Sequence, residues 1–281
     1  MRKISTGLLF FVTLVFISCQ KEIDWGLGGG NTANQLLVKI SSKTGTDSAV
    51  ISYSYDAQKR LIRETVIGVS TGTSLDNDLV INRNAAGIIT RTIQKSPAFV
   101  AAGVDSVVTR FNYNPASSQY TSGVFSITIA GFTITDSAVY TYDAGGKIAS
   151  DIHYLGTGIL PPIQILKDQY TYSADGLNLV SIVQLASLTP GAPLSPLSTQ
   201  TFNFDNKINP LIIKNEGVLL ARTGLYNANN GSKLALDNTV DATVNFTMDY
   251  TFKYNTANKP DSSFGTRTPG GTVTASKYFY Q

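Results

Sequence analysis

Aromatic and β-branched residues alternate with polar residues along most of the chain, and the clearest instance is residues 139–148. Tyr140 and Tyr142 lie two positions apart, so their side chains project from one face of an extended strand. The residues that follow suit a tight turn, with Gly145 and Gly146 expected at positive φ. A second strand, from Ile148 to Tyr154, resumes the same alternation. The pattern predicts a β-hairpin.

Variants of this hairpin recur along the chain. Copies occur at Tyr53/Tyr55, Phe111/Tyr113, Tyr140/Tyr142, Tyr170/Tyr172, Phe202/Phe204 and Phe252/Tyr254, with a weaker copy over residues 79–89. The second aromatic residues of the middle copies are 29, 30 and 32 positions apart (142 − 113, 172 − 142 and 204 − 172). Such a period indicates repeated units, each of which buries its face only against its neighbours.

The last interval between copies is longer, at 50 residues (254 − 204). We expect one unit in this interval to be degenerate or to carry an insertion. Asp205 with Asn206, and the segment 227–233, have turn composition and are predicted to be turns.

Two strands per unit predict an all-β fold, a large curled antiparallel sheet formed by a meander of repeated hairpins. Residues 177–183 have apolar side chains on both faces, so the sheet is expected to roll into a half-barrel or a β-roll that encloses its aromatic face. No segment has helical periodicity. The sequence leaves open whether the sheet closes on itself.

The first residues have the pattern of an export signal. Arg2 and Lys3 are basic, and residues 7–17 form an apolar run that is too short to span a bilayer. Ser18 and Cys19 follow, and this arrangement resembles the lipobox of bacterial lipoproteins, although Phe16 stands where that family usually has leucine. The resemblance implies that the signal is removed and that Cys19 carries a lipid.

The cysteine count supports a lipid anchor. Cys19 is the only cysteine, so an intramolecular disulfide is impossible and lipidation explains the thiol. The alternative is a cleaved secretory signal followed by an incidental free cysteine. We therefore divide the chain into a signal peptide (1–18), a lipidated N-terminus with a glycine-rich flexible tether (19–34) and one all-β domain (35–281).

The repeat and the anchor together resemble known sequences. Tyr140, Tyr142, Asp143, Gly146, Lys147 and Ile148 are similar to the tyrosine-aspartate (YD, or RHS-type) repeat. With the lipobox and the charged segment 20–24, the chain resembles uncharacterised Bacteroidota outer-membrane lipoproteins built of such hairpins. The resemblance implies an address at the outer membrane, lipid-anchored and at the cell surface, and it implies no activity. The period is longer and the copies fewer than in long YD-repeat proteins.

The charge balance of the chain argues against a nucleic-acid partner. Removal of residues 1–18 takes away Arg2 and Lys3, which leaves 22 − 2 = 20 basic against 19 acidic side chains. A nearly neutral chain does not provide the excess of basic side chains that nucleic-acid binding requires, so no nucleic-acid partner is expected. Trp25, the only tryptophan, lies in the tether, where an interfacial position is favoured over glycan stacking.

Two features resemble parts of a hydrolase. Gly68, Ser70 and Gly72 match the Gly-x-Ser-x-Gly nucleophile elbow, but loop residues follow instead of a helix. His153 is the only histidine, and we interpret it as a solvated residue on a strand. A catalytic triad would require both, so we predict no catalytic residues.

Metal and carboxylate sites have little support. With one histidine and one cysteine, no transition-metal site is expected and no cofactor is predicted. Asp76 and Asp78 resemble the start of a calcium loop that lacks its glycine and glutamate. Glu22, Glu64 and Glu216 are the only glutamates, so a two-carboxylate glycosidase site would have to use aspartates distant in sequence.

The leading hypothesis is a non-catalytic envelope lipoprotein, with no enzyme activity, that binds a glycan or an envelope protein through long loops. Those loops are residues 68–78, 156–167 and 187–198. The binding residues and the ligand stay unknown at this level. The alternatives are an envelope polysaccharide-acting enzyme with an aspartate-based site and a purely structural envelope component.

Overall fold

The computed structural model describes residues 35–281 except 130–131, 158–160, 188 and 190. The first strands are β1 (Leu37–Thr44), β2 (Asp47–Tyr55), β3 (Leu61–Ser70), β4 (Thr73–Ser74), β5 (Asn77–Arg83), β6 (Ile89–Lys95), β7 (Val107–Asn114), β8 (Gln119–Ile129) and β9 (Phe132–Tyr142). The others are β10 (Ile148–Gly156), β11 (Ile163–Tyr172), β12 (Leu179–Ala186), β13 (Ser195–Ile208), β14 (Asn229–Asn238), β15 (Phe246–Tyr254), β16 (Pro260–Thr268) and β17 (Val273–Tyr280). The helical segments are α2 (Pro97–Ala101), α3 (Asn215–Leu219) and the 3₁₀ turns η1 (Thr223–Tyr226) and η2 (Ala242–Val244).

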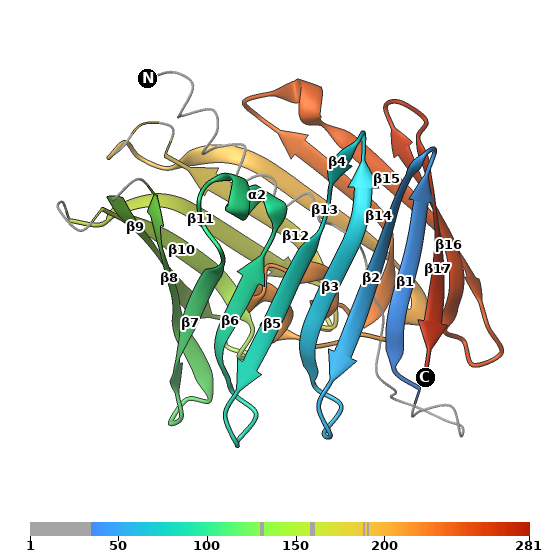
Figure 1. Ribbon diagram of the computed structural model, residues 1–281, viewed down its shortest axis with the longest axis horizontal. Coiled ribbons are helices and arrows are strands. Elements are labelled where there is room, and N and C mark those ends of the chain that lie inside the picture. Colours follow the sequence, from blue (N-terminus) through green and yellow to red (C-terminus); the bar gives the residue numbers. More distant parts are fainter. Residues whose placement is uncertain (1–34, 130–131, 158–160, 188, 190) are drawn as a thin grey trace.

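The sheet closes into a barrel (Figure 1). Each strand pairs antiparallel with the next, except that β3 pairs with β5 beyond the short β4, and β17 returns to pair with β1. Among the described residues, the seventeen strands without β4 form a ring of sixteen. The all-β prediction is confirmed, and a closed barrel replaces the half-barrel or roll because twist accumulates over sixteen strands until the two edges meet.

An Asp or Asn side chain caps several of the tight turns. Asp143 Oδ1 accepts hydrogen bonds from the backbone N–H groups of Gly145 (2.8 Å) and Lys147 (2.9 Å). Gly146 has φ +76°, whereas Gly145 does not have a positive φ, so only one of the two glycines expected there needs the left-handed region. The same turn occurs at Asp56 with Lys59 (φ 63°) and at Asn255 with Asn258 (φ 57°).

A β-bulge after the turn changes which side chains face inward. The register between β9 and β10 shifts between Ile148 and Ser150. Ile148 is fully buried, and His153 is paired with the inward-facing Ala138, so Ile152 and Tyr154 face outward. The uninterrupted alternation expected from Ile148 to Tyr154 is therefore wrong, because a bulge adds one residue to the strand.

The aromatic repeat packs inside the barrel and fixes neighbouring strands to one another. Four tyrosine hydroxyls donate to a backbone carbonyl close to them in space: Tyr55 to Leu37 (2.6 Å), Tyr142 to Tyr120 (2.9 Å), Tyr172 to Ile148 (2.6 Å) and Tyr280 to Pro260 (2.8 Å). A ring in the core and a satisfied hydroxyl together explain why tyrosine suits this position.

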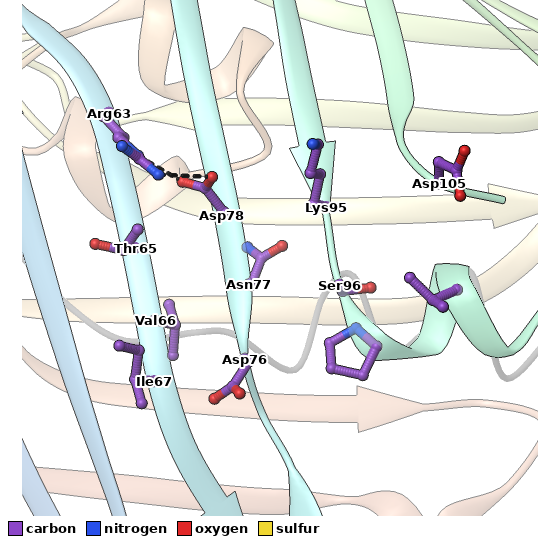
Figure 2. Close-up of a pocket in the computed structure, with 12 residues that line it drawn as sticks. Arg63, Thr65, Val66, Ile67, Asp76, Asn77, Asp78, Lys95, Ser96 and Asp105 are labelled. Atoms are coloured by element: carbon purple, nitrogen blue, oxygen red, sulfur yellow. Dashed lines mark hydrogen bonds and ion pairs between the residues drawn. The ribbon is translucent and has the colours of Figure 1, made fainter.

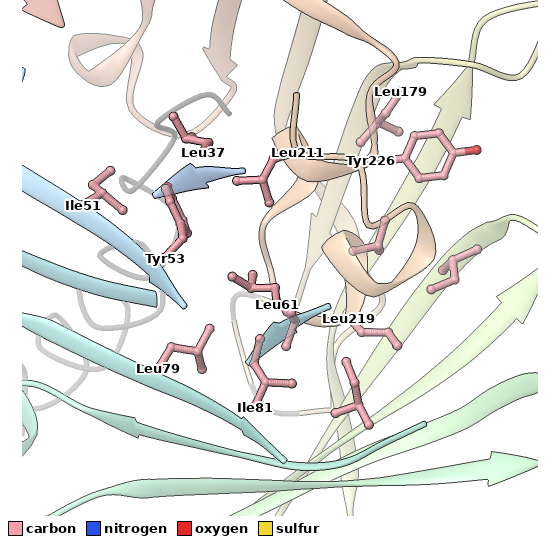
Figure 3. Close-up of a cluster of buried hydrophobic side chains, with 14 of the residues drawn as sticks. Leu37, Ile51, Tyr53, Leu61, Leu79, Ile81, Leu179, Leu211, Leu219 and Tyr226 are labelled. Atoms are coloured by element: carbon pink, nitrogen blue, oxygen red, sulfur yellow. The ribbon is translucent and has the colours of Figure 1, made fainter. Parts of the chain in front are cut away.

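The long interval before the last repeat contains an insertion, as expected. Strand β13 continues through Asp205 and Asn206, and residues 229–233 belong to β14, so both turn predictions there are wrong. Residues 209–228, here called the plug, enter the barrel between these two strands. Leu211, Leu219 and Tyr226 of the plug belong to the same buried core cluster as Leu61, Leu79 and Ile81 of the wall (Figure 3).

Two buried ion pairs hold the plug. Arg83 donates two hydrogen bonds of 2.8 Å to the carboxylate of Glu216, and Arg222 Nε donates to Glu64 Oε1 at 2.9 Å. The plug contains α3, which corrects the prediction of no helix, as does α2. Each of these helices has five residues, too few to show a 3.6-residue period.

The two ends of the barrel differ. Both ends of the described chain lie at the same end as the Asp- and Asn-capped turns, here called the tight-turn end, where Leu36 N donates to Gln281 O at 2.8 Å. The longer connections, including residues 71–76, 96–106 and 239–245, lie at the other end (Figure 1). No helix among the described residues is long and apolar enough to cross a membrane.

Candidate functional site

The wall of the barrel is interrupted where β3 changes its partner. Residues 63–66 of β3 pair with β5, whereas Val69 and Ser70 pair with β4. Helix α2 lies beyond the end of β6, with Ser96 Oγ accepting from Phe99 N at 3.3 Å and Phe99 buried. The space bounded by β3, β5, β6 and α2 is a pocket of about 320 Å³, here called the wall pocket (Figure 2).

The wall pocket combines charged and aliphatic side chains. Its charged residues are Arg63, Asp76, Asp78, Lys95 and Asp105, and its uncharged residues are Thr65, Val66, Ile67, Asn77, Ser96, Pro97 and Val100. Ile67 is 67% exposed and Val100 is 62% exposed, so aliphatic surface faces solvent beside the charges.

Neighbouring groups hold the polar side chains of the pocket in place. The Arg63 guanidinium donates to both carboxylate oxygens of Asp78, at 2.7 and 2.9 Å. Asp76 Oδ1 accepts from Gly68 N at 3.0 Å. Asn77 Oδ1 accepts from Gln94 Nε2 at 3.1 Å. Because these bonds already hold the side chains in place, the side chains lose less conformational entropy when a ligand binds.

A second polar group lies inside the barrel on β9 to β12. His153 Nδ1 is 2.9 Å from Asp136 Oδ2, and His153 Nε2 is 3.7 Å from Asp151 Oδ2. Tyr170 donates to Asp151 at 3.2 Å. Asp168, which is 4% exposed, accepts from Gln184 Nε2 at 3.0 Å. We call these residues the inner acidic cluster.

Burial and mutual charge change how the inner acidic cluster titrates. Burial and, after it, the nearby charge of Asp151 together raise the pKa of Asp168 to about 7. Burial lowers the pKa of His153, but the hydrogen bonds to Asp136 and Asp151 outweigh it, so the pKa lies well above its usual value. Burial also raises the pKa of Tyr170 well above its usual value. Near neutral pH the cluster therefore combines an imidazolium with a carboxyl that is still partly protonated.

Comparison with solved structures finds similar folds, including two in Bacteroides proteins. One is described as a porin-like protein from Bacteroides uniformis, with a TM-score of 0.53 and 15% identity over 87% of this chain and 98% of that one. The other is described as a porin-like protein from Bacteroides vulgatus, with a TM-score of 0.54 and 10% identity over 88% and 99%. The likeness is one of fold. Comparison of the sequence with known protein families and with curated proteins gives no match.

The two hydrolase-like features, Ser70 and His153, have different hydrogen-bonding partners and do not bond to each other. Ser70 Oγ donates to Asp47 Oδ2 at 3.0 Å at the end of β3. His153 contacts Asp136 and Asp151 on the inner face and has a side chain that is 23% exposed. The interpretation of His153 as a solvated strand residue is therefore wrong, because the bulge before it turns the side chain inward. Ser70 is bonded to a carboxylate and has no histidine beside it, so the Ser-His pair of a hydrolase triad is not formed.

Asp76 and Asp78, the pair that resembles the start of a calcium loop, line the wall pocket. Asp76 is bonded to the backbone and Asp78 to an arginine, and no group of metal-ligating side chains is present in the described residues. Of the predicted binding loops, residues 68–78 supply three lining residues of the wall pocket. Cys19, Trp25 and Glu22 lie outside the described residues.

Sequence reasoning missed both polar sites. Lys95 reaches the wall pocket because it pairs with Asp78 across β5 and β6, and Asp105 reaches it from the segment that follows α2. No local pattern indicates either position. The inner acidic cluster had a usable signal, since Asp151 and His153 are two residues apart on one strand and share a face. The β-bulge after Ile148 determines that this shared face is the inner one, and the sequence does not reveal the bulge.

Proposed function

We propose that this chain is a non-catalytic cell-envelope lipoprotein, anchored through a lipid on Cys19, whose barrel binds a glycan or a protein partner at the cell surface. The main support for the proposal is the position at which the chain enters the barrel. Leu36 bonds to Gln281, and Lys259 Nζ donates to Gln35 O at 3.0 Å, both at the tight-turn end. A tether to Cys19 would hold this end toward the membrane and present the longer loops to the outside.

The outer wall supports attachment by a lipid rather than by insertion of the barrel. A barrel that crosses a membrane presents an apolar band to the lipid. By the strand register, the outward positions here include Lys39, Lys43, Arg63, Arg91, Arg110, Lys167, Lys233, Lys253 and Lys277, together with many serines and threonines. Placing this wall in hydrocarbon would bury several charges, at a cost of about 2–4 kcal/mol for each one near the midplane.

The interior supports a scaffold rather than a pore. A sixteen-stranded barrel is wide enough to enclose a water-filled channel. In this chain the plug and the aromatic core fill the tight-turn end, where Leu211 and Leu61 are almost completely buried. The rigid, filled end gives the longer loops a fixed base, which suits a binding protein.

The arrangement of polar groups favours binding over catalysis. Ser70 has no histidine beside it, and His153 lies between carboxylates inside the barrel. Asp136 and Asp151 both contact His153, and Asp168 accepts from Gln184, so these carboxylates already have partners on the inner face. An aspartate-based glycosidase would need its two carboxylates beside an open substrate groove.

The proposal is tested on the lipidated protein and on cells. Purified protein in detergent is electrophoresed through gels that contain single polysaccharides, and intact cells are treated with a cross-linker to capture envelope proteins. We expect retardation by a polysaccharide or capture of one defined protein, with no release of reducing sugar. Release of sugar would support the enzyme alternative. Neither binding nor capture, combined with a fragile envelope in a deletion strain, would support the structural alternative.

A further inference from the structure

The wall pocket combines fixed charges with exposed aliphatic side chains on the outer wall. We propose that it is a binding site for a neutral glycan, an inference that rests on the proposed function and assigns its site and ligand class.

The polar groups of the pocket match the hydroxyl groups of a sugar. A sugar hydroxyl both donates and accepts, so a site that binds sugars needs donors and acceptors side by side. Arg63 and Lys95 supply donors, and Asp76 and Asp78 supply acceptors. Because Asp78 and Arg63 orient one another, their remaining hydrogen-bonding positions stay at fixed places.

The aliphatic side chains match the other surface of a sugar, its C–H face. Ile67 and Val100 border the pocket and are more than half exposed, so covering them removes apolar surface from water. The volume of about 320 Å³ lies at the lower end of the range for ligand pockets and suits a short segment of a chain.

The charge of the pocket argues against ionic ligands. Two basic side chains face three acidic ones, which gives 2 − 3 = −1. Phosphorylated or sulfated ligands need a basic excess, and a cationic peptide would gain little from so small an acidic excess.

The backbone around the pocket argues against an added peptide strand. Peptides commonly bind by extending an unpaired sheet edge. Asp78, Leu79 and Val80 of β5 pair with β3 on one side and with β6 on the other. The strand that crosses the pocket therefore has no free edge, and recognition must come from side chains.

The experiment uses the lipidated full protein in detergent and a panel of four neutral polysaccharides (dextran, laminarin, inulin and yeast mannan) with heparin as an anionic probe. Affinity electrophoresis gives a Kd for each. Val100→Trp and Ile67→Trp place a bulky ring in the pocket from exposed positions, and Val139→Trp, on the outer face of β9 and 40% exposed, is the matched control.

We expect at least one neutral polysaccharide to bind, and each pocket variant to weaken that binding tenfold or more while Val139→Trp leaves it unchanged. If a neutral polysaccharide binds equally to all four proteins, the site is wrong and the proposed function stands. If no neutral polysaccharide binds, or only heparin does, the glycan assignment is overturned, and cross-linking to a protein in the same cells then decides whether the proposed function survives. Far-UV circular dichroism confirms that each variant is folded.

Discussion

Replacement of Asp168 by Asn should stabilise the protein at neutral and alkaline pH. Asp168 is 4% exposed, and its pKa of about 7 lies above the ordinary value of 3.8. The folded chain therefore keeps a proton that the unfolded chain releases, so native stability falls as pH rises from about 4 to about 7. A shift of about three pKa units corresponds to at most about 4 kcal/mol, at 1.36 kcal/mol for each unit.

Asn reproduces the shape and neutrality of the protonated carboxyl, and its Oδ1 retains the bond from Gln184. The variant should lose this part of the pH dependence and gain on the order of 1–4 kcal/mol relative to the wild type at pH 8, with little change at pH 4. Because the charges of Asp151 and His153 act on Asp168 in opposite directions, the gain is expected below the upper limit.

The measurement is urea unfolding of residues 20–281, followed by far-UV circular dichroism at pH 4, 6 and 8. Asp105→Asn, at an exposed carboxylate of the wall pocket, is the control and should change stability by less than about 0.5 kcal/mol. If Asp168→Asn destabilises the protein at pH 8, Asp168 acts there as an ionised partner of His153, and the reasoning is refuted.

Four further predictions follow from the anchor, the turns and the polar sites. Labelled palmitate should enter the protein, and Cys19→Ser should abolish the label; unchanged labelling excludes lipidation. Protease added to intact cells should degrade the barrel, and full protection would place it on the periplasmic side. Gly146→Val should cost about 1–3 kcal/mol because φ is +76°, whereas Gly146→Asn and Ser117→Val should cost little; equal losses for all three would show that backbone strain is not the cause. Ser70→Ala should leave function intact, and His153→Ala should lower stability by about 3–5 kcal/mol by unpairing buried carboxylates; loss of a phenotype with normal folded amount in either variant would support an enzyme.

The repeat was predictable from sequence because its cause is local. Aromatic residues two apart, followed by Asp or Asn and a residue that tolerates positive φ, specify a hairpin and its turn within a few positions. Asp143 and Gly146 have the predicted roles. The insertion after Phe204 was also detectable, since it lengthens an otherwise regular interval.

The polar sites were not predictable because their causes are not local. A single bulge after Ile148 reverses the facing of every later residue on β10, and alternation alone gives no sign of a bulge. The wall pocket depends on β3 leaving β5 after Val66 and on α2 lying beside it. The periodicity within each of these segments does not indicate which other segment it will pair with.

The plug and the closure of the barrel are connected by geometry. A barrel of about eight strands is filled by its own side chains, but the diameter grows with strand number, and sixteen strands leave a lumen that side chains alone do not fill. A chain with aromatic inward positions cannot leave that lumen wet without exposing them. Residues 209–228 supply the missing apolar volume, and Arg83 and Arg222 pair with Glu216 and Glu64 where the plug meets the wall. The insertion that breaks the sequence period is therefore what allows the aromatic repeat to form a closed barrel with a packed interior.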